Sequence, residues 1–303
     1  MILNAQKPLP VIFDTDIGDD IDDALALALA LQSPELDIRA VTTVSDDTEQ
    51  RARLVWKELG LYNRRDIPIG VGVREPLLDP MHSGTAPQFQ VLTQEDTIPP
   101  AQRHSAIPLI IDTLLNSPGK VTLIPVGPLT NIALALRIEP RIKEKIERIV
   151  LMGGAFDPPR AEYNILRDRV AARIVFSSGV PISAVGLDVT SRCKLQGADF
   201  DRLRAANNPA SQFLVKLITL WQNGKPHQYP TLHDPLAVAA AFQPALLEFA
   251  TGTVAVEVAD PKHYGLTTFT RIEGGGTKAA MNVTVPEFLK VFTDRLSREP
   301  RGK

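Results

Sequence analysis

Near its amino end the chain reads Pro10-Val11-Ile12-Phe13-Asp14-Thr15-Asp16-Ile17-Gly18-Asp19-Asp20-Ile21-Asp22-Asp23-Ala24. An apolar run is followed at once by six aspartates within ten residues. Like charges at this density repel one another strongly once they are desolvated, unless a cation or a set of donors lies among them. Because the candidate ligands are hard carboxylate oxygens with no Cys or His nearby, the pattern predicts a bound Ca²⁺ or Mg²⁺ rather than Zn²⁺.

Short β-rich runs alternate with helical patterns along the whole chain, which is typical of βαβ units around a mainly parallel sheet. Strands are expected near 10–14, 38–44, 67–71, 121–126, 148–152, 181–187 and 253–258, and helices near 22–32, 47–60, 105–116, 129–137, 168–178, 209–223 and 234–242. No repeat or low-complexity linker divides the sequence. We therefore predict an α/β fold in one domain over residues 1–303, with an open, Rossmann-like sheet flanked by helices.

Composition narrows the classes of function. The chain has 303 residues, of which 44% are hydrophobic and 22% charged, as in an ordinary globular protein. The formal net charge is -2 and basic residues are scattered, so neither nucleic acid nor a membrane surface is an expected partner. A single cysteine, Cys193, and an amino end that lacks the apolar core of a signal peptide favour a cytoplasmic location.

In open α/β sheets, ligands bind beyond the carboxyl ends of the strands. In this sequence those places hold the aspartate run after the first predicted strand, Asp46-Asp47 after the second, Gly127 after the fourth and Gly153-Gly154 after the fifth. We therefore expect the site at this edge of the sheet, with the aspartate run at its centre.

Three further segments need an assignment, and two of them are candidates for binding loops. Two irregular stretches, roughly 78–104 and 223–232, have the length of binding loops, and they contain His82 and Tyr229. A glycine run at 274–276 lacks the spacing of a phosphate loop and is expected to be a turn between late strands.

Five motifs, spread from about residue 10 to about residue 295, resemble the nucleoside hydrolases, the calcium-dependent N-ribohydrolases of the inosine-uridine-preferring type. They are the opening Asp-x-Asp-x-Gly with Asp-Asp-Ala, Val126-Gly127-Pro128-Leu129-Thr130-Asn131-Ile132-Ala133, Leu151-Met152-Gly153-Gly154-Ala155, Ala161-Glu162-Tyr163-Asn164-Ile165 with Asp168, and Leu232-His233-Asp234-Pro235-Leu236. The resemblance implies the nucleoside hydrolase fold and hydrolysis of ribonucleosides to free base and ribose by a calcium-bound water. It also implies a role in purine or pyrimidine salvage and a homodimer or homotetramer.

Carried over to this sequence, the resemblance implies a metal and catalytic set. The carboxylates of Asp16, Asp23 and Asp234 and the backbone carbonyl of Val126 would bind Ca²⁺. Asp16 would also take the proton of the attacking water, and His233 would help the base to leave.

The resemblance also implies a sugar-binding set. Asp22 would accept a hydrogen bond from a ribose hydroxyl, and Asp47 could accept one as well. Met152, Glu162 and Asn164 match positions that hold the sugar. His82 and Tyr229 are the candidates for contact with the base.

Two positions depart from the family's pattern. The family has one residue between the glycine and the aspartate pair, whereas Asp19-Asp20-Ile21 separates Gly18 from Asp22. Either Asp19-Asp20 or Asp22-Asp23 could then be the binding pair, and the following Ala24 and the start of the expected helix favour the second. Asp46-Asp47 replaces Gly-Asn, and a carboxylate cannot donate a hydrogen bond as an amide does.

The chemistry explains why such residues are needed. Breaking an N-glycosidic bond puts positive charge on the sugar and negative charge on the departing base. Carboxylates suit the first need, and an imidazole such as that of His233 suits proton donation near neutral pH. Direct attack by water would invert the anomeric centre.

Two other functions compete on the sequence alone. A haloacid-dehalogenase-type phosphatase also opens with a strand that ends in Asp-x-Asp and uses Mg²⁺, but the His233-Asp234-Pro235 unit has no place in it. A homologue that binds calcium and ribose without turnover is the second alternative, and the two departures motivate it.

Overall fold

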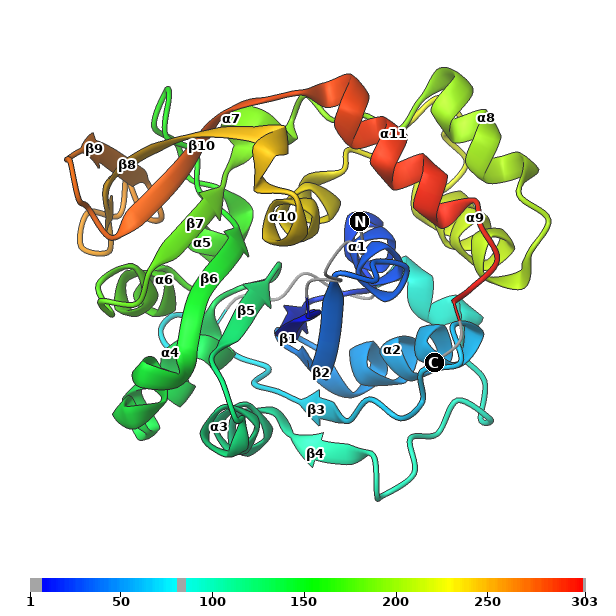
Figure 1. The fold of residues 1–303 in the computed structure, drawn as a ribbon, viewed down its shortest axis with the longest axis horizontal. Coiled ribbons are helices and arrows are strands. Elements are labelled where there is room, and N and C mark those ends of the chain that lie inside the picture. Colours follow the sequence, from blue (N-terminus) through cyan, green and yellow to red (C-terminus); the bar gives the residue numbers. More distant parts are fainter. Residues whose placement is uncertain (1–6, 81–85, 302–303) are drawn as a thin grey trace, which may run out of the picture.

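The computed structural model describes residues 7–80 and 86–301. Its middle layer is a ten-stranded sheet in the order β4-β3-β2-β1-β5-β6-β7-β10-β8-β9 (Figure 1). Neighbouring strands from β4 to β10 pair in parallel, whereas β10, β8 and β9 pair antiparallel. The strands are β1 (Leu9–Thr15), β2 (Leu36–Thr43), β3 (Ile69–Val71), β4 (Arg103–Ser105), β5 (Val121–Pro125), β6 (Ile146–Met152), β7 (Ile182–Val185), β8 (Leu247–Val256), β9 (Thr267–Arg271) and β10 (Thr277–Val283). The predicted open, mainly parallel sheet is confirmed.

Helices cover both faces of this sheet (Figure 1). One face carries α1 (Asp22–Leu31), α2 (Thr48–Leu61), α8 (Gly197–Ala205), α9 (Pro209–Gln222), α10 (His233–Phe242) and α11 (Val285–Leu296). The other face carries α3 (Ala106–Asn116), α4 (Thr130–Ile138) and α6 (Arg169–Phe176). The short helices are α5 (Tyr163–Arg167), α7 (Leu187–Thr190), η1 (Pro87–Val91), η2 (Pro140–Lys145) and η3 (Pro244–Leu246).

The apolar strands explain the three layers. Successive side chains of a strand point to opposite faces, and in β1 Val11 and Phe13 pack into one layer while Ile12 packs into the other. All three are fully buried, and each such burial contributes roughly 1.5–3 kcal/mol to stability. A strand that is apolar on both faces belongs in the middle of a helix-covered parallel sheet.

This topology sets the place of the site. At the carboxyl ends of the central strands, the Val126 amide donates to the Asp14 carbonyl at 2.8 Å and the Val44 amide donates to the Thr15 carbonyl at 3.0 Å. The loop after β1 leads into α1, and α10 packs beside α1 (Figure 1). The first turns of these two helices therefore meet at the carboxyl edge of the sheet.

Several elements differ from expectation. The predicted strand 181–187 ends at Val185 because α7 begins at Leu187. Strands β4, β9 and β10 and helices α5, α7, α8 and α11 were not predicted; the three residues of β4 are all exposed, so they carry no apolar signal. The glycine run 274–276 does form the predicted turn, between β9 and β10. Among the described residues, no helix combines the length and the apolar character needed to cross a membrane.

Candidate active site

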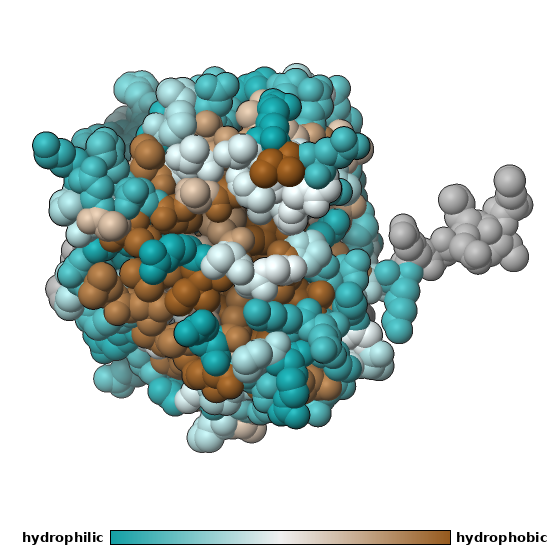
Figure 2. Space-filling model, turned by 90° about the vertical axis from the view of Figure 1, so that its left-hand side faces the viewer, coloured by the Kyte–Doolittle hydropathy of each residue, from teal (hydrophilic) through white to brown (hydrophobic). Residues whose placement is uncertain are grey.

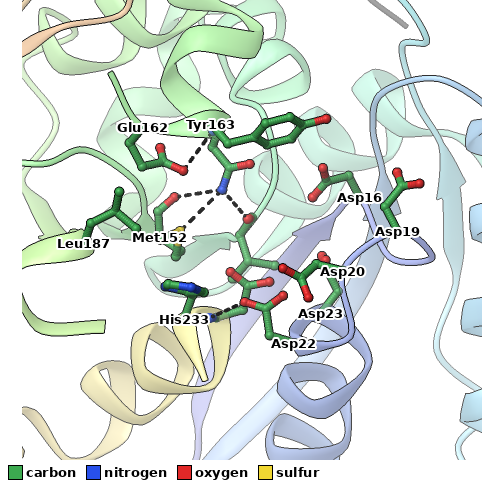
Figure 3. A pocket seen from close by; sticks show the side chains of 13 residues that line it. Asp16, Asp19, Asp20, Asp22, Asp23, Met152, Glu162, Tyr163, Leu187 and His233 are labelled. Atoms are coloured by element: carbon green, nitrogen blue, oxygen red, sulfur yellow. Dashed lines mark hydrogen bonds between the residues drawn. The ribbon is translucent and has the colours of Figure 1, made fainter. Parts of the chain in front are cut away.

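A cavity of about 390 Å³ opens at the carboxyl edge of the sheet (Figure 3). Its lining residues are Asp16, Asp19, Asp20, Asp22, Asp23, Val126, Met152, Glu162, Tyr163, Asn164, Leu187, His233 and Asp234. Acidic side chains dominate this set, and none of the described residues in it is a lysine or an arginine. The cavity therefore concentrates negative charge without a lining side chain that balances it.

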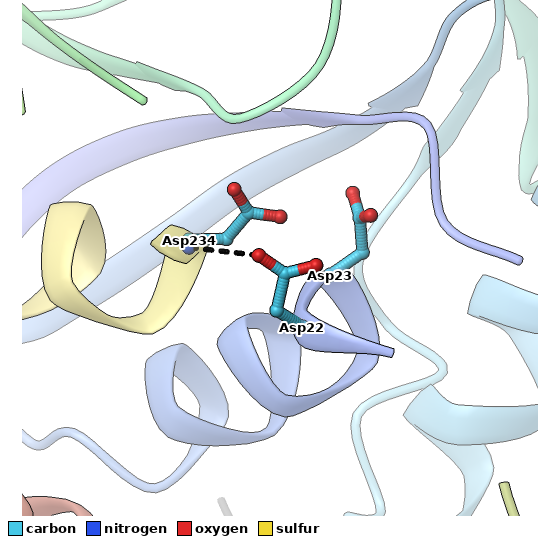
Figure 4. A group of neighbouring side chains, drawn as sticks. All are labelled: Asp22, Asp23 and Asp234. Atoms are coloured by element: carbon cyan, nitrogen blue, oxygen red, sulfur yellow. Dashed lines mark hydrogen bonds between the residues drawn. The ribbon is translucent and has the colours of Figure 1, made fainter. Parts of the chain in front are cut away.

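Three of these carboxylates form a tight group (Figure 4). Asp22 and Asp23 lie in the first turn of α1 and Asp234 in the first turn of α10, and one oxygen from each lies within 4.8 Å of the others. The Asp234 amide donates to Asp22 Oδ2 at 3.2 Å, and Thr15 Oγ1 donates to Asp23 Oδ1 at 2.5 Å. We call Asp22, Asp23 and Asp234 the aspartate cluster.

The electrostatics of the aspartate cluster favour a bound cation. Burial above all, and repulsion between neighbours in addition, raise the pKa of each of its carboxyls well above the usual range. Two like charges roughly 4 Å apart repel by about 4 kcal/mol at an effective dielectric constant of about 20. The dipoles of the two helices stabilise each negative charge at their N-termini by only about 0.3–1 kcal/mol. A buried, oxygen-only donor set with this imbalance fits Ca²⁺ or Mg²⁺.

Asp16 lies beside the aspartate cluster, in the cavity wall (Figure 3). Its charge adds to the raised pKa of Asp23 and of Asp234. Burial raises the pKa of Asp16 itself to about 6, against the opposing charge of Arg51. Its Oδ1 lies so close to Gly127 that a Cβ at position 127 would stand only 2.6 Å away. The structure thus places Asp16, Asp23, Asp234 and Val126 around one cavity, and it brings Asp22-Asp23 rather than Asp19-Asp20 to Asp234.

Three of the predicted sugar-binding residues, Met152, Glu162 and Asn164, line the wall opposite the aspartate cluster (Figure 3). Glu162 caps α5, where its carboxylate accepts from the Asn164 amide at 2.9 Å, and it also accepts from the Gly154 amide at 3.2 Å. Burial raises the pKa of Glu162 to about 7. Asn164 Nδ2 donates to the carbonyls of Val126 at 2.7 Å and of Met152 at 3.3 Å. Asn164 therefore positions the Val126 carbonyl and leaves its own Oδ1 for another partner.

His233 opens α10 and faces the cavity (Figure 3). Its Nδ1 lies 2.7 Å from Thr190 Oγ1. Burial lowers the pKa of this imidazole to about 4, so it is neutral at neutral pH. From the sequence we expect an imidazole that donates a proton near neutral pH, and the lowered pKa differs from that expectation. The sequence does not show how deeply a histidine is buried, and burial is what lowers the pKa.

Three predicted substrate contacts lie elsewhere or cannot be placed. Asp47 is the N-cap of α2, where its Oδ1 accepts from the Gln50 amide at 3.2 Å. Tyr229 is 37% exposed and packs edge-to-face on Phe200, with 5.9 Å between ring centroids. Neither residue lines the cavity. His82 lies outside the described residues.

Four lining residues had no role assigned from the sequence: Asp19, Asp20, Tyr163 and Leu187. The first two belong to the aspartate run and Tyr163 follows Glu162 directly, so their position in the motifs was the available signal. Leu187 carries no such signal, since an apolar residue after a strand is ordinarily assigned to the core.

Comparison with known proteins places this geometry in a family. The sequence pattern described as inosine-uridine preferring nucleoside hydrolase matches residues 11–296. The pyrimidine-specific ribonucleoside hydrolase RihA of Citrobacter koseri is 36% identical over 306 residues, which cover 95% of this chain and 97% of that protein. RihA of Enterobacter sp. strain 638 is 37% identical over 307 residues, with coverage of 95% and 96%.

Solved structures agree with this assignment. A plant nucleoside hydrolase is 30% identical and superposes with a TM-score of 0.84, covering 96% of this chain and 99% of that one. The purine-preferring ribonucleoside hydrolase from Gardnerella vaginalis is 31% identical, with a TM-score of 0.81 and coverage of 95% and 98%. These matches leave no ground for the phosphatase alternative. The chain belongs to the inosine-uridine preferring nucleoside hydrolase family, and its reaction is hydrolysis of the N-glycosidic bond of ribonucleosides.

Proposed function

We propose that this hydrolysis depends on calcium held at the aspartate cluster, with Asp16 and the Val126 carbonyl completing the protein's ligands. One observation carries the proposal: three buried carboxylates meet within 4.8 Å, and no lysine or arginine is among the described residues of the cavity wall. When bound there, the ion supplies positive charge that orients water and the vicinal ribose hydroxyls and makes the water more acidic. The family resemblance supports calcium over magnesium.

Asp16 is the proposed base. Its carboxylate lies in the cavity wall beside the aspartate cluster, and a pKa of about 6 makes it a stronger base than an ordinary aspartate while it stays ionised at pH 7. Attack by water on the face of the sugar opposite the departing nucleobase would invert the configuration of the anomeric carbon. Glu162 and Asn164 Oδ1, on the opposite wall, would hold the sugar hydroxyls.

His233 is the proposed partner of the leaving base. When Thr190 donates its hydroxyl hydrogen to Nδ1, the ring proton lies on Nε2 and is available to the base. Because the imidazole is neutral at pH 7, its contribution is a hydrogen bond that strengthens as negative charge develops on the base. In this role His233 only donates a hydrogen bond to the departing base and does not need to be a charged imidazolium that transfers its proton.

Base preference is the finer part of the proposal. The two RihA relatives are named pyrimidine-specific and are 36% and 37% identical to this chain, while the purine-preferring Gardnerella vaginalis enzyme is 31% identical. We therefore place uridine and cytidine first among the substrates.

A reducing-sugar assay tests the proposal with uridine, cytidine, inosine and adenosine. We expect ribose release to stop after a calcium chelator and to return with Ca²⁺ better than with Mg²⁺. We also expect 2′-deoxyuridine to react poorly, since it lacks a hydroxyl that the ion and Asp22 would hold. Full activity in the chelated protein, or equal rates for uridine and its deoxy analogue, would contradict this site.

The resemblance also supports a homodimer or homotetramer, and the single cysteine, Cys193, agrees with a reducing, cytoplasmic location. Figure 2 shows apolar side chains gathered on the side that carries β8, β9 and α6, which is compatible with contact to a second copy. Light scattering coupled to size-exclusion chromatography tests the oligomer, and a purely monomeric species would contradict it.

A further inference from the structure

Behind the aspartate run lies a buried arginine that the proposed chemistry does not use. Arg51, on α2, is only 1% exposed. Its guanidinium donates Nε to the Ser45 carbonyl at 2.8 Å, Nη1 to the carbonyls of Asp16 and of Ile17, the latter at 2.8 Å, and Nη2 to Asp19 Oδ2 at 2.6 Å. One side chain thus ties the loop after β1 to the loop after β2.

A second buried arginine extends these contacts to the sugar-binding wall. Arg167 ends α5, the helix that begins next to Glu162 and carries Asn164, and it is 3% exposed. Its Nη2 forms an ion pair with Asp46 Oδ1 at 2.6 Å. Asp46 Oδ2 lies 3.8 Å from Arg51 Nη2, so this carboxylate lies between the two guanidiniums. We call Asp19, Arg51, Asp46 and Arg167 the arginine brace.

The backbone at the centre of the arginine brace is strained. Ser45 and Asp46 have φ values of 71° and 53°, a left-handed conformation that non-glycine residues rarely adopt twice in succession. The Ser45 amide donates to the Val73 carbonyl and the Asp46 amide to the Arg74 carbonyl, both at 2.8 Å. Arg167 Nε donates to Ser45 Oγ at 3.0 Å. Such strain persists only where the surroundings fix the backbone, and it is commonly found at active sites.

We propose that Arg51 is a positioning residue that fixes the Asp16 carboxylate relative to the aspartate cluster. The loop needs this restraint because Gly18, two residues after Asp16, has a φ of 130° and gives the loop a point of conformational freedom. Arg51 is not among the cavity-lining residues, so it acts through Asp16 and not on substrate. The inference rests on the proposed function, in which Asp16 is both ligand and base.

The geometry requires an arginine and not merely a positive charge. Four acceptors from two loops surround the guanidinium, and a planar fork with five donors can reach them together. A lysine offers one nitrogen, which cannot span the same acceptors. Arg51→Lys therefore keeps the charge and removes the positioning.

The test compares Arg51→Lys and Arg51→Met with a matched control, Arg103→Met, in the full-length chain. Arg103 also forms a two-contact ion pair with α2, to Glu49 at 2.6 Å and 3.2 Å, but on the exposed surface away from the cavity. We would measure kcat and KM for a ribonucleoside, calcium affinity by titration calorimetry, and folding by circular dichroism.

We expect kcat of both Arg51 variants to fall by about 10²-fold, the usual consequence of misplacing a catalytic group by about 1 Å. At saturating calcium KM should change little, because Glu162 and Asn164 keep their places through Arg167. Calcium affinity should fall in parallel with kcat, because Asp16 is a proposed ligand, whereas Arg103→Met should retain the parental values.

A second variant decides the matter if the Arg51 variants do not fold. Asp46→Asn keeps the side-chain shape and the tolerance for the left-handed backbone but weakens the hold on both arginines, so kcat and calcium affinity should fall in the same direction and by less. Parental kcat and calcium affinity in every folded variant would overturn the proposal, provided that Asp234→Asn is inactive. An active Asp234→Asn would instead overturn the proposed function.

Discussion

The aspartate cluster and the arginine brace both include acids of the run that follows β1, yet their charges are balanced in opposite ways. Asp19 and Asp46 contact the buried guanidiniums of Arg51 and Arg167. Asp22, Asp23 and Asp234 share a cavity wall in which none of the described residues is a lysine or an arginine. A dense acidic run is therefore not in itself a metal site. The side chains that arrive from other elements decide which acids are structural and which are left for a cation.

The largest expected effect comes from removing one negative charge from the aspartate cluster, compared with removing one from the arginine brace. Asp23→Asn should lower kcat/KM by at least about 10²-fold, because the change alters a proposed metal ligand directly and loss of a supporting contact to a ligand already costs about 10–100-fold. In calcium-free protein the same change should raise Tm, since it relieves repulsion and keeps the bond from Thr15. Asp46→Asn should instead lower Tm, because two buried arginines lose their shared anion.

Thermal unfolding in the presence of a chelator measures both variants. The contrast between the two groups would be broken if the two Tm shifts had the same sign, or if Asp23→Asn kept its calcium affinity.

An intermediate effect is expected where the two groups meet, at Asp16. In Gly127→Ala the new Cβ would lie 2.6 Å from Asp16 Oδ1 and 2.9 Å from the Asp16 amide nitrogen, so Asp16 or its loop must shift. We expect kcat to fall by roughly 10- to 100-fold with little change in circular dichroism, in line with the cost of a small misplacement. Gly179→Ala is a poor control because its φ of 81° is itself strained, whereas Gly276→Ala has open space and an unstrained backbone. Parental kcat in Gly127→Ala would show that the position of Asp16 is not critical.

The smallest effect is a difference in pH dependence. The carboxyls of the aspartate cluster have folded-state pKa values raised well above the usual 3.8, and Glu162 is raised to about 7. Their contribution to the free energy of unfolding is therefore fully present below about pH 4 and is lost as the pH rises through the raised values. Calcium competes with those protons, so its stabilising effect should grow between pH 5 and pH 8.

The measurement is the Tm gained on adding calcium across that pH range, with Asp46→Asn as the comparison. This variant leaves the cluster's carboxyls in place, so its calcium-induced gain should keep the same upward trend. A gain that is flat with pH in the parental protein would mean that these carboxyls are not the ligands.

The sequence predicted the parts of the molecule that depend on local pattern. The apolar runs of β1, β5 and β6 identify buried parallel strands, and Ala24 together with the expected helix start near residue 22 correctly favoured Asp22-Asp23 as the pair that meets Asp234. It did not predict β9 and β10, which each pair antiparallel with β8, nor α5 and α7, which are too short to show a helical period.

The rest of the site depends on distant partners that no local pattern reveals. Asp47 before a helix fits both a cap and a sugar contact, and only the fold shows the cap. The pKa of His233 depends on how deeply its imidazole is buried, and the Nδ1 partner, Thr190, lies 43 residues earlier in the chain. Arg51 and Arg167 had no role assigned from the sequence, because their partners lie far along the chain: Ser45, which accepts from Arg167 Nε, is 122 residues away.

The contact between Asp22 and the amide of Asp234 joins positions 212 residues apart. A growing polypeptide therefore lacks the complete aspartate cluster, and with it the proposed calcium site, until α10 has been synthesised and has docked beside α1. Calcium binding should therefore require the completed fold. A fragment that ends before residue 234 should bind calcium no more tightly than the denatured chain, however much of its sheet has formed.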